Sequence, residues 1–135
     1  FMTLFYLTID PIAGRLAWVR AGHDPAILFD PMTKSFEELR GSGMALGVDR
    51  SWQYVENRMA ALSTGHIIFL GTDGIWETRN PRGEMFGKKP VYDILQKNAS
   101  LKAEDLITRI VNQLNDYRGS QEPEDDITLM VIKIT

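Results

Sequence analysis

The chain contains no cysteine among its 135 residues. This absence excludes disulfide bonds, thiolate metal sites and every mechanism that uses a cysteine nucleophile. Long apolar runs are lacking too, because no stretch approaches the roughly 20 residues that a membrane-spanning helix needs. The chain also does not open with the pattern of a secretory signal. We therefore expect a cytoplasmic location and no membrane contact from this segment.

The sequence also lacks any concentration of positive charge. Lysine and arginine never occur in runs longer than two, as at Lys88 and Lys89, and the formal net charge is −3 at pH 7. Binding to the phosphate backbone of nucleic acid requires a concentrated basic face. Nucleic acid is therefore not an expected partner.

Apolar residues, at 44% of the chain, provide enough material for the core of one domain. Runs rich in β-branched and aromatic residues alternate with turn residues, which is typical of strands joined by tight turns. Consecutive strands joined in this way favour antiparallel pairing. Strands are expected over residues 2–9, 15–20, 25–30, 52–62, 67–72 and 125–134, with a short one near Phe36.

Two helices are expected before the last strand. Pro90 suits a first helical turn and is followed by Val91, Ile94 and Leu95 at helical spacing. Ser100 is expected to cap a second helix. That helix carries one apolar stripe, formed by Leu106, Ile107, Ile110, Val111 and Leu114. The stripe is interpreted as packing onto a sheet, with a partner-binding face as the alternative.

The stretches 67–70 and 127–132 are apolar on both faces. A strand with one wet face alternates apolar and polar residues, so these two must be covered by a second sheet on one side and by helices on the other. The sequence therefore predicts an α+β fold in which helices flank two packed, mostly antiparallel sheets, an α-β-β-α sandwich.

Carboxylates stand at the ends of both stretches. Asp73 follows the first and precedes Gly74, whereas Asp125 and Asp126 precede the second. If the strands are antiparallel neighbours, these carboxylates meet at one rim, where like charges require a cation between them. Mg²⁺ and Mn²⁺ prefer such oxygen ligands. The alternative needs no metal: Asp-Gly is a turn and Asp125 caps the start of a strand.

Four sequence blocks occur in order. They are AGHDPAILFDP at 21–31, GMALGV at 43–48, GHIIFLGTDGIWETRNPRGEMFG at 65–87 and DDITLMVIKI at 125–134. Together they resemble the metal-dependent serine/threonine protein phosphatases of the 2C type. More narrowly, they resemble the bacterial branch typified by the stage II sporulation phosphatase and the regulators of stress sigma factors. One Asp-Gly alone is unspecific, whereas four blocks in order are specific.

The resemblance implies that Asp73 and Asp125 bind metal. Asp126 is an alternative ligand or a support for the site, beside Gly74. Two Mn²⁺ or Mg²⁺ ions would share a water that attacks the phosphorus of a phosphoserine or phosphothreonine directly, without a phosphoenzyme. His23 is either a rim residue near this site or a packed turn histidine.

Residues 77–87 resemble the segment that lies near the substrate entrance in this family. Arg79 and Arg82 are candidates to meet a phosphoprotein there, and solvated loop charges are the alternative. His66 is interpreted as a surface turn residue without a chemical role.

The resemblance also implies a larger domain. The family has an upstream block of the form Gly-Asp-x-x-Gly-His-Gly, whose aspartate bridges both metals, and nothing between Phe1 and Asp10 matches it. We therefore expect residues 1–135 to be the C-terminal major part of one phosphatase domain, with its upstream part and any sensor domain absent. We expect this segment alone to bind metal weakly and to hydrolyse little. Where sheet surface is uncovered, we expect a homodimer, swapped strands, or coverage by further residues of the protein.

The function implied is hydrolysis of phosphoserine or phosphothreonine on a regulatory protein, as an output domain of bacterial signalling. The implied partner is a phosphorylated protein of the anti-sigma-factor antagonist type, and upstream regions are a route for tethering to a membrane sensor. The alternative is a non-catalytic module that keeps the phosphatase fold as a binding scaffold. Asp73 and Asp125 favour the enzyme.

Overall fold

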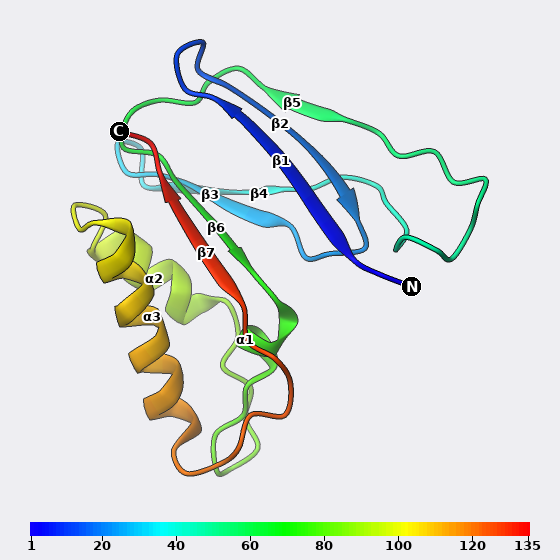
Figure 1. Ribbon diagram of the computed structural model, residues 1–135. Helices are drawn as coiled ribbons and strands as arrows, with labels where there is room; N and C mark the ends of the chain where they lie inside the picture. Colours follow the sequence, from blue (N-terminus) through cyan, green and yellow to red (C-terminus); the bar gives the residue numbers. More distant parts are fainter.

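The computed structural model describes residues 1–135, which form two antiparallel sheets and three helices (Figure 1). The first sheet has the order β1-β2-β5, with β1 (Leu4–Asp10), β2 (Arg15–Ala21) and β5 (Asn57–Met59). The second has the order β4-β3-β6-β7, with β3 (Ala26–Asp30), β4 (Ser35–Leu39), β6 (Ile67–Gly71) and β7 (Leu129–Lys133). The predicted antiparallel pairing is confirmed.

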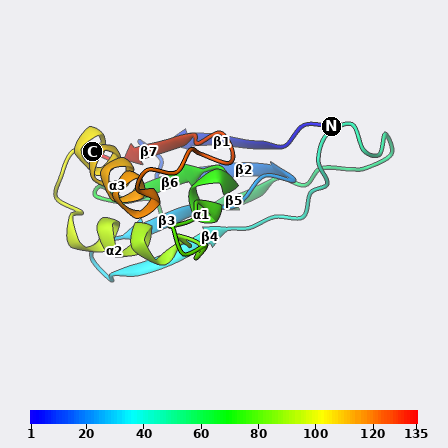
Figure 2. The same cartoon turned by 90° about the horizontal axis from the view of Figure 1, so that it is seen from below.

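The two sheets pack face to face around an apolar layer. Leu16 and Trp18 of β2 meet Leu28 of β3 and Ile68 of β6 there, and all four side chains are buried. Strand alternation explains the contact, because every second side chain of a strand points to the same face. β1 and β7 are edge strands of their respective sheets, and both lie at the same edge of the sandwich (Figure 2).

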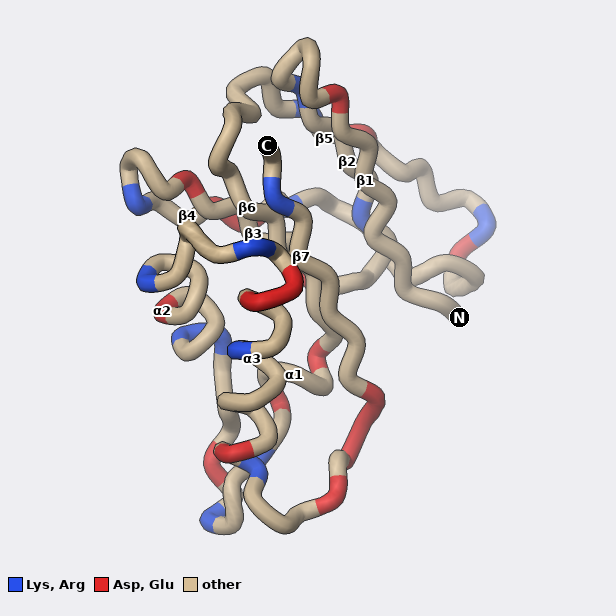
Figure 3. Tube along the Cα trace, turned by 60° about the vertical axis from the view of Figure 1, so that its left-hand side comes forward, with Lys and Arg blue, Asp and Glu red and all other residues tan.

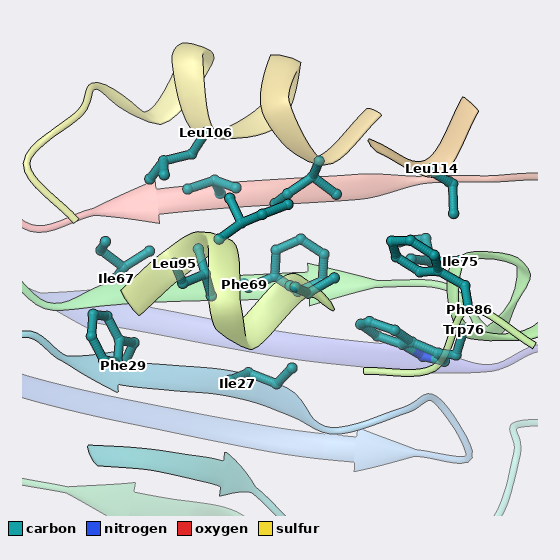
Figure 4. Packing of buried hydrophobic residues seen from close by; sticks show 14 residues of the cluster. Ile27, Phe29, Ile67, Phe69, Ile75, Trp76, Phe86, Leu95, Leu106 and Leu114 are labelled. Carbon is teal, nitrogen blue, oxygen red and sulfur yellow. The ribbon is translucent and has the colours of Figure 1, made fainter. Parts of the chain in front are cut away.

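The helices cover the outer face of the second sheet. They are α1 (Asp73–Glu77), α2 (Lys89–Lys97) and α3 (Ala103–Arg118). Figure 4 shows Leu106 of α3 above Ile67 and Phe69 of β6, and Leu95 of α2 beside them, in one cluster with Phe29 of β3. This confirms that the apolar stripe of α3 packs onto a sheet. The outer face of the β1-β2-β5 sheet carries no helix of this chain (Figure 1), and no helix is long and apolar enough to cross a bilayer.

Three expectations about the elements were wrong in part. The strand expected over 52–62 is limited to β5, because only three residues of β2 pair with it, and Trp52 and Val55 lie partly exposed outside the sheet. Ser100 does not cap α3, whose N-cap is Lys102. The last strand starts at Leu129 rather than at residue 125.

The coverage of the two apolar strands also differs. β6 is central and buried on both faces, as Ile67, Ile68 and Phe69 are each at most 1% exposed. β7 is an edge strand: Val131 faces the helices and is buried, but Met130 on the other face is 56% exposed. Its two-sided apolar pattern is therefore covered on the helix side and only partly on the other.

Candidate metal site

The candidate site lies where β6 ends and β7 begins. Gly71 pairs with Leu129 in the antiparallel register, so the chain leaving β6 runs beside the chain entering β7. Thr72 continues this contact beyond the strands. Its backbone N–H donates to the carbonyl of Thr128 at 3.0 Å, and its Oγ1 accepts from the N–H of Thr128 at 3.1 Å. Asp73, the first residue of α1, is thereby placed at the same rim as the segment before β7.

Gly74 shows how closely the two segments approach. A β-carbon at Gly74 would lie 2.5 Å from the carbonyl oxygen of Asp126 and 3.6 Å from the β-carbon of Asp125. Only glycine leaves room for the Asp125–Asp126 turn against the first turn of α1. Asp73 and Asp125 are both solvent-exposed, so their carboxylates are open to a ligand.

Negative charge accumulates at this rim. Four of the five residues at 122–126 are acidic, and they are coloured red in Figure 3 on the loop that leads into β7. Neither Asp73 nor Asp125 is part of an ion pair, although the amide of Asp126 donates to Asp125 Oδ1 at 2.7 Å. Carboxylates without a basic partner are the hard oxygen donors that Mg²⁺ and Mn²⁺ select.

The donor set fits a divalent cation in kind but not in number. No three His, Cys, Asp or Glu side chains of this chain gather closely enough to hold a metal ion. A role of Asp73 and Asp125 as metal ligands therefore stays a prediction, and a complete site would need further ligands.

Comparison with known proteins now identifies the family. The profile of Stage II sporulation protein E (SpoIIE) matches residues 1–135. The chain belongs to this family. The family resemblance predicted from the four sequence blocks is thus confirmed.

Two curated relatives of the SpoIIE-family chain illustrate the match. "Phosphoserine phosphatase RsbU" of Bacillus subtilis is 25% identical over 134 residues, which cover 98% of this chain and 39% of the relative. "Protein IcfG" of Synechocystis is 27% identical over 132 residues, which cover 98% of this chain and 20% of the relative. The chain thus spans well under half the length of these relatives.

Solved structures show the same fold. The SiaA-PP2C domain of Pseudomonas aeruginosa superposes with a TM-score of 0.84 at 23% identity, covering 98% of this chain and 52% of that one. The PP2C phosphatase domain of SpoIIE from Bacillus subtilis gives 0.76 at 18% identity, covering 98% and 37%. The predicted α+β fold of two packed antiparallel sheets with helices is therefore confirmed. Related structures include a SpoIIE domain presoaked with Mn and RsbX in complex with magnesium.

His23 lies at the same rim. Its ring packs edge-on against Phe5 with 6.4 Å between centroids, and its Nδ1 is 2.9 Å from the carbonyl oxygen of Asp24. Together with Gly71, Thr72 and Thr128 it lines a hollow between the ends of the two sheets. The structure thus shows a packed histidine at the rim, and a role for His23 in the metal site stays a prediction.

Arg79 and Arg82 lie in the loop between α1 and α2, where they bond within the loop. Arg79 Nη1 donates to the carbonyl of Gly83 at 2.6 Å, and Arg82 forms an exposed ion pair with Glu84 at 3.3 Å. The interpretation as solvated loop charges describes Arg82, whereas Arg79 stabilises the loop through its hydrogen bond to Gly83. A role for either in substrate binding stays a prediction.

The expectation for His66 was wrong. The residue is 9% exposed rather than on the surface. Its Nδ1 accepts from the amide of Ser63 at 3.3 Å, and its Nε2 lies 3.7 Å from Asp30 Oδ1. Burial follows from its position directly before the central strand β6.

One contact at the rim was not visible in the sequence. Asp24, the neighbour of His23, accepts a 2.7 Å hydrogen bond from Trp76 Nε1 of α1. The two residues are 52 positions apart, and no local pattern indicates the pairing. The only available signal was an indole N–H within an apolar run, since a buried indole usually finds an acceptor.

Proposed function

We propose that the intact protein hydrolyses phosphoserine or phosphothreonine on a regulatory protein, using two Mn²⁺ or Mg²⁺ ions held in part by Asp73 and Asp125. One observation carries this proposal: two unpaired, exposed aspartates from distant parts of the sequence are brought to one rim. Membership of a phosphatase family and relatives named phosphoserine phosphatases support it.

The aspartates serve as ligands and the backbone around them sets their geometry. When bound, such a metal pair lowers the pKa of a shared water and offsets charge on the phosphoryl group. Asp73 is presented at the start of α1, and Asp125 by a turn that its own carboxylate closes through the amide of Asp126. Asp126 is the alternative ligand, since it occupies the same turn.

A complete site needs a further carboxylate. With only two carboxylate ligands for two metal ions, the site would bind metal weakly and would not fix the coordination geometry. We therefore infer that residues 1–135 are the C-terminal major part of one phosphatase domain, in which an upstream aspartate would complete the ligand set. This segment alone is expected to bind metal weakly and to turn over little substrate.

The setting proposed is bacterial signalling in the cytoplasm. RsbU and RsbP are named phosphoserine phosphatases, and a structure with 20% identity and a TM-score of 0.73 contains the RsbU and RsbW domains of Rv1364c from Mycobacterium tuberculosis. These relatives support a phosphorylated protein of the anti-sigma-factor antagonist type as the substrate. Sensor domains outside this segment, including membrane-tethered ones, would provide the input.

Replacement of the aspartates in the intact protein tests the proposal. Asp73→Asn and Asp125→Asn should each lower Mn²⁺-dependent hydrolysis of a phosphoserine peptide by at least about a hundredfold, because a metal ligand is lost. Asp105→Asn, an exposed aspartate on α3, is the matched control and should leave the rate unchanged. Asp126→Asn distinguishes the two neighbouring candidates.

Two outcomes would contradict the proposal. Full activity of Asp73→Asn and Asp125→Asn would show that these residues are not ligands. An intact wild-type protein that binds the phosphoprotein without metal-dependent turnover would instead support the alternative, a non-catalytic scaffold.

A further inference from the structure

The short helix α1 has little stability of its own. It contains only five residues, whereas isolated helices shorter than about 12 residues are marginal even in favourable sequences. Its N-cap residue, Thr72, makes no side-chain capping bond to the helix, since its hydroxyl bonds to the segment before β7 instead. Contacts with the rest of the fold must therefore fix the orientation of α1 and of Asp73, its first residue.

Trp76 is one of two side chains of α1 that anchor the helix in the core, beside the fully buried Ile75. The indole is 8% exposed and packs against Phe69 of β6 with 5.7 Å between ring centroids. Its Nε1 donates at 2.7 Å to Oδ2 of Asp24, a half-buried residue in the loop that crosses from β2 to β3. Asp24 thus ties the edge of the indole to the start of a central strand.

The face of the indole is held separately. Lys88 Nζ lies 5.3 Å from the ring centroid, at cation–π distance, and donates to Glu38 Oε1 of β4 at 3.0 Å. Trp76 is therefore fixed at its edge by Asp24 and over its face by Lys88. Asp24 lies just before β3, and Lys88 bonds to Glu38 of β4. Both contacts therefore connect Trp76 to the β3–β4 side of the second sheet, away from β7.

We propose that Asp24 is a positioning residue for the metal site: by holding the indole of Trp76 it orients α1 and presents Asp73 to the cation. Residues three apart are neighbours on a helix surface, so rotation of the helix about a released Trp76 displaces Asp73. As far as Asp73 is a metal ligand, this inference rests on the proposed function. The alternative role for Asp24 is only to satisfy a buried indole N–H.

Three variants of the intact protein separate these roles. Asp24→Ala removes the acceptor, Trp76→Phe removes the donor, and Asp24→Asn keeps an oxygen acceptor without the charge. Asp30→Ala, at the other end of β3, is the matched control because it also removes a carboxylate that bonds a turn. Hydrogen exchange of the α1 amides without metal measures helix order, and Mn²⁺ titration followed by electron paramagnetic resonance measures the site.

We expect Asp24→Ala and Trp76→Phe each to raise amide exchange in α1 by about tenfold and to weaken Mn²⁺ binding by about tenfold, the range seen when a support of a metal ligand is lost. Asp24→Asn should restore both quantities to within about threefold of wild type, since its Oδ1 still accepts the indole N–H. Asp30→Ala should change neither. The double variant Asp24→Ala/Trp76→Phe should be little more impaired than either single variant, because both substitutions remove the same hydrogen bond.

Two results would overturn the inference. One is wild-type exchange in α1 together with wild-type Mn²⁺ affinity in Asp24→Ala. The other is equal impairment of Asp24→Asn and Asp24→Ala, which would assign the effect to charge rather than to position. If the wild-type protein binds no Mn²⁺, the proposed function fails, while the exchange measurement still decides whether Asp24 orders α1.

Discussion

At the scale of single residues, Gly74 is the glycine that confines the candidate metal site. Because a β-carbon there would lie 2.5 Å from a backbone oxygen of Asp126, Gly74→Ala must push α1 and the Asp125 turn apart. Overpacking of this kind costs about 1–3 kcal/mol. Urea denaturation should show that loss in the free energy of unfolding, and Mn²⁺ affinity should fall with it. If Gly74→Ala changed neither the free energy of unfolding nor the Mn²⁺ affinity, the backbone at the rim would accommodate the methyl group without disturbing the site.

The sequence predicted the residues of the rim better than their contacts. Asp73 and Asp125 follow from strand ends and from the order of the blocks, because antiparallel neighbours bring such ends together. In the loop before β3, the sequence analysis singled out His23 and not Asp24, although Asp24 is the residue that bonds to Trp76. Burial of His66 was missed as well. Such pairings depend on which distant segment packs where, and local spacing carries no information about that.

At the scale of elements, α3 is held by its buried stripe rather than by its sequence propensity. Ile110 is fully buried beneath it, whereas Ile107 on the same helix is half-buried. Ile110→Ala should therefore lower the free energy of unfolding by about 2–5 kcal/mol through lost burial and a residual cavity. Ile107→Ala is the control and should cost clearly less in the same urea denaturation series. Equal costs would show that the site beneath Ile110 collapses to fill the space.

The link between β4 and the loop before α2 predicts a pH dependence. The hydrogen bond from Lys88, followed by the charges of Lys88 and Arg40, lowers the pKa of Glu38 below its ordinary value of 4.5. A depressed carboxyl pKa stabilises the fold above the ordinary value, and this contribution is lost as the pH falls through the folded-state pKa. Lys88→Met should thus cost about 1 kcal/mol at pH 7.

The same comparison at low pH provides the check. The difference between wild type and Lys88→Met, measured by urea denaturation, should shrink as the pH falls below 4.5 and Glu38 becomes protonated. A difference that stays constant with pH would assign the loss to the contact of Lys88 with Trp76 instead.

Element boundaries were predictable where a pattern and a partner coincide. The apolar run of β6 and the stripe of α3 were found from the sequence because burial determines both patterns. The segment at 52–62 has strand-like composition, yet only β5 pairs within it. β2 continues to Ala21, but residues 52–56 do not pair with it, and composition does not reveal this. The start of α3 was displaced for a similar reason: the amide of Leu101 bonds to Asn98 at the end of α2, so Ser100 belongs to that turn.

At the scale of the whole molecule, the two faces of the sandwich differ. The second sheet is covered by helices, whereas the outer face of the first sheet is open (Figure 1). β1 and β7 are unpaired edge strands of the two sheets. On β1, Leu4 is 41% exposed and Tyr6 is 59% exposed on this outer face, while Phe5 and Leu7 point into the core. Exposed apolar surface next to open strand edges favours association.

The 135-residue chain, produced alone, should therefore self-associate rather than remain at its monomer mass of 15.3 kDa. Light scattering coupled to size-exclusion chromatography measures this directly. The double variant Leu4→Lys and Tyr6→Lys should shift the chain toward monomer, because charge on an outer strand opposes pairing and covers apolar surface. Ile12→Lys is the matched control, since Ile12 is 99% exposed in the turn after β1, off the sheet face. A wild-type chain that stays monomeric would show that the open face is tolerated in water, and equal effects of both substitutions would assign the association to general hydrophobicity rather than to β1.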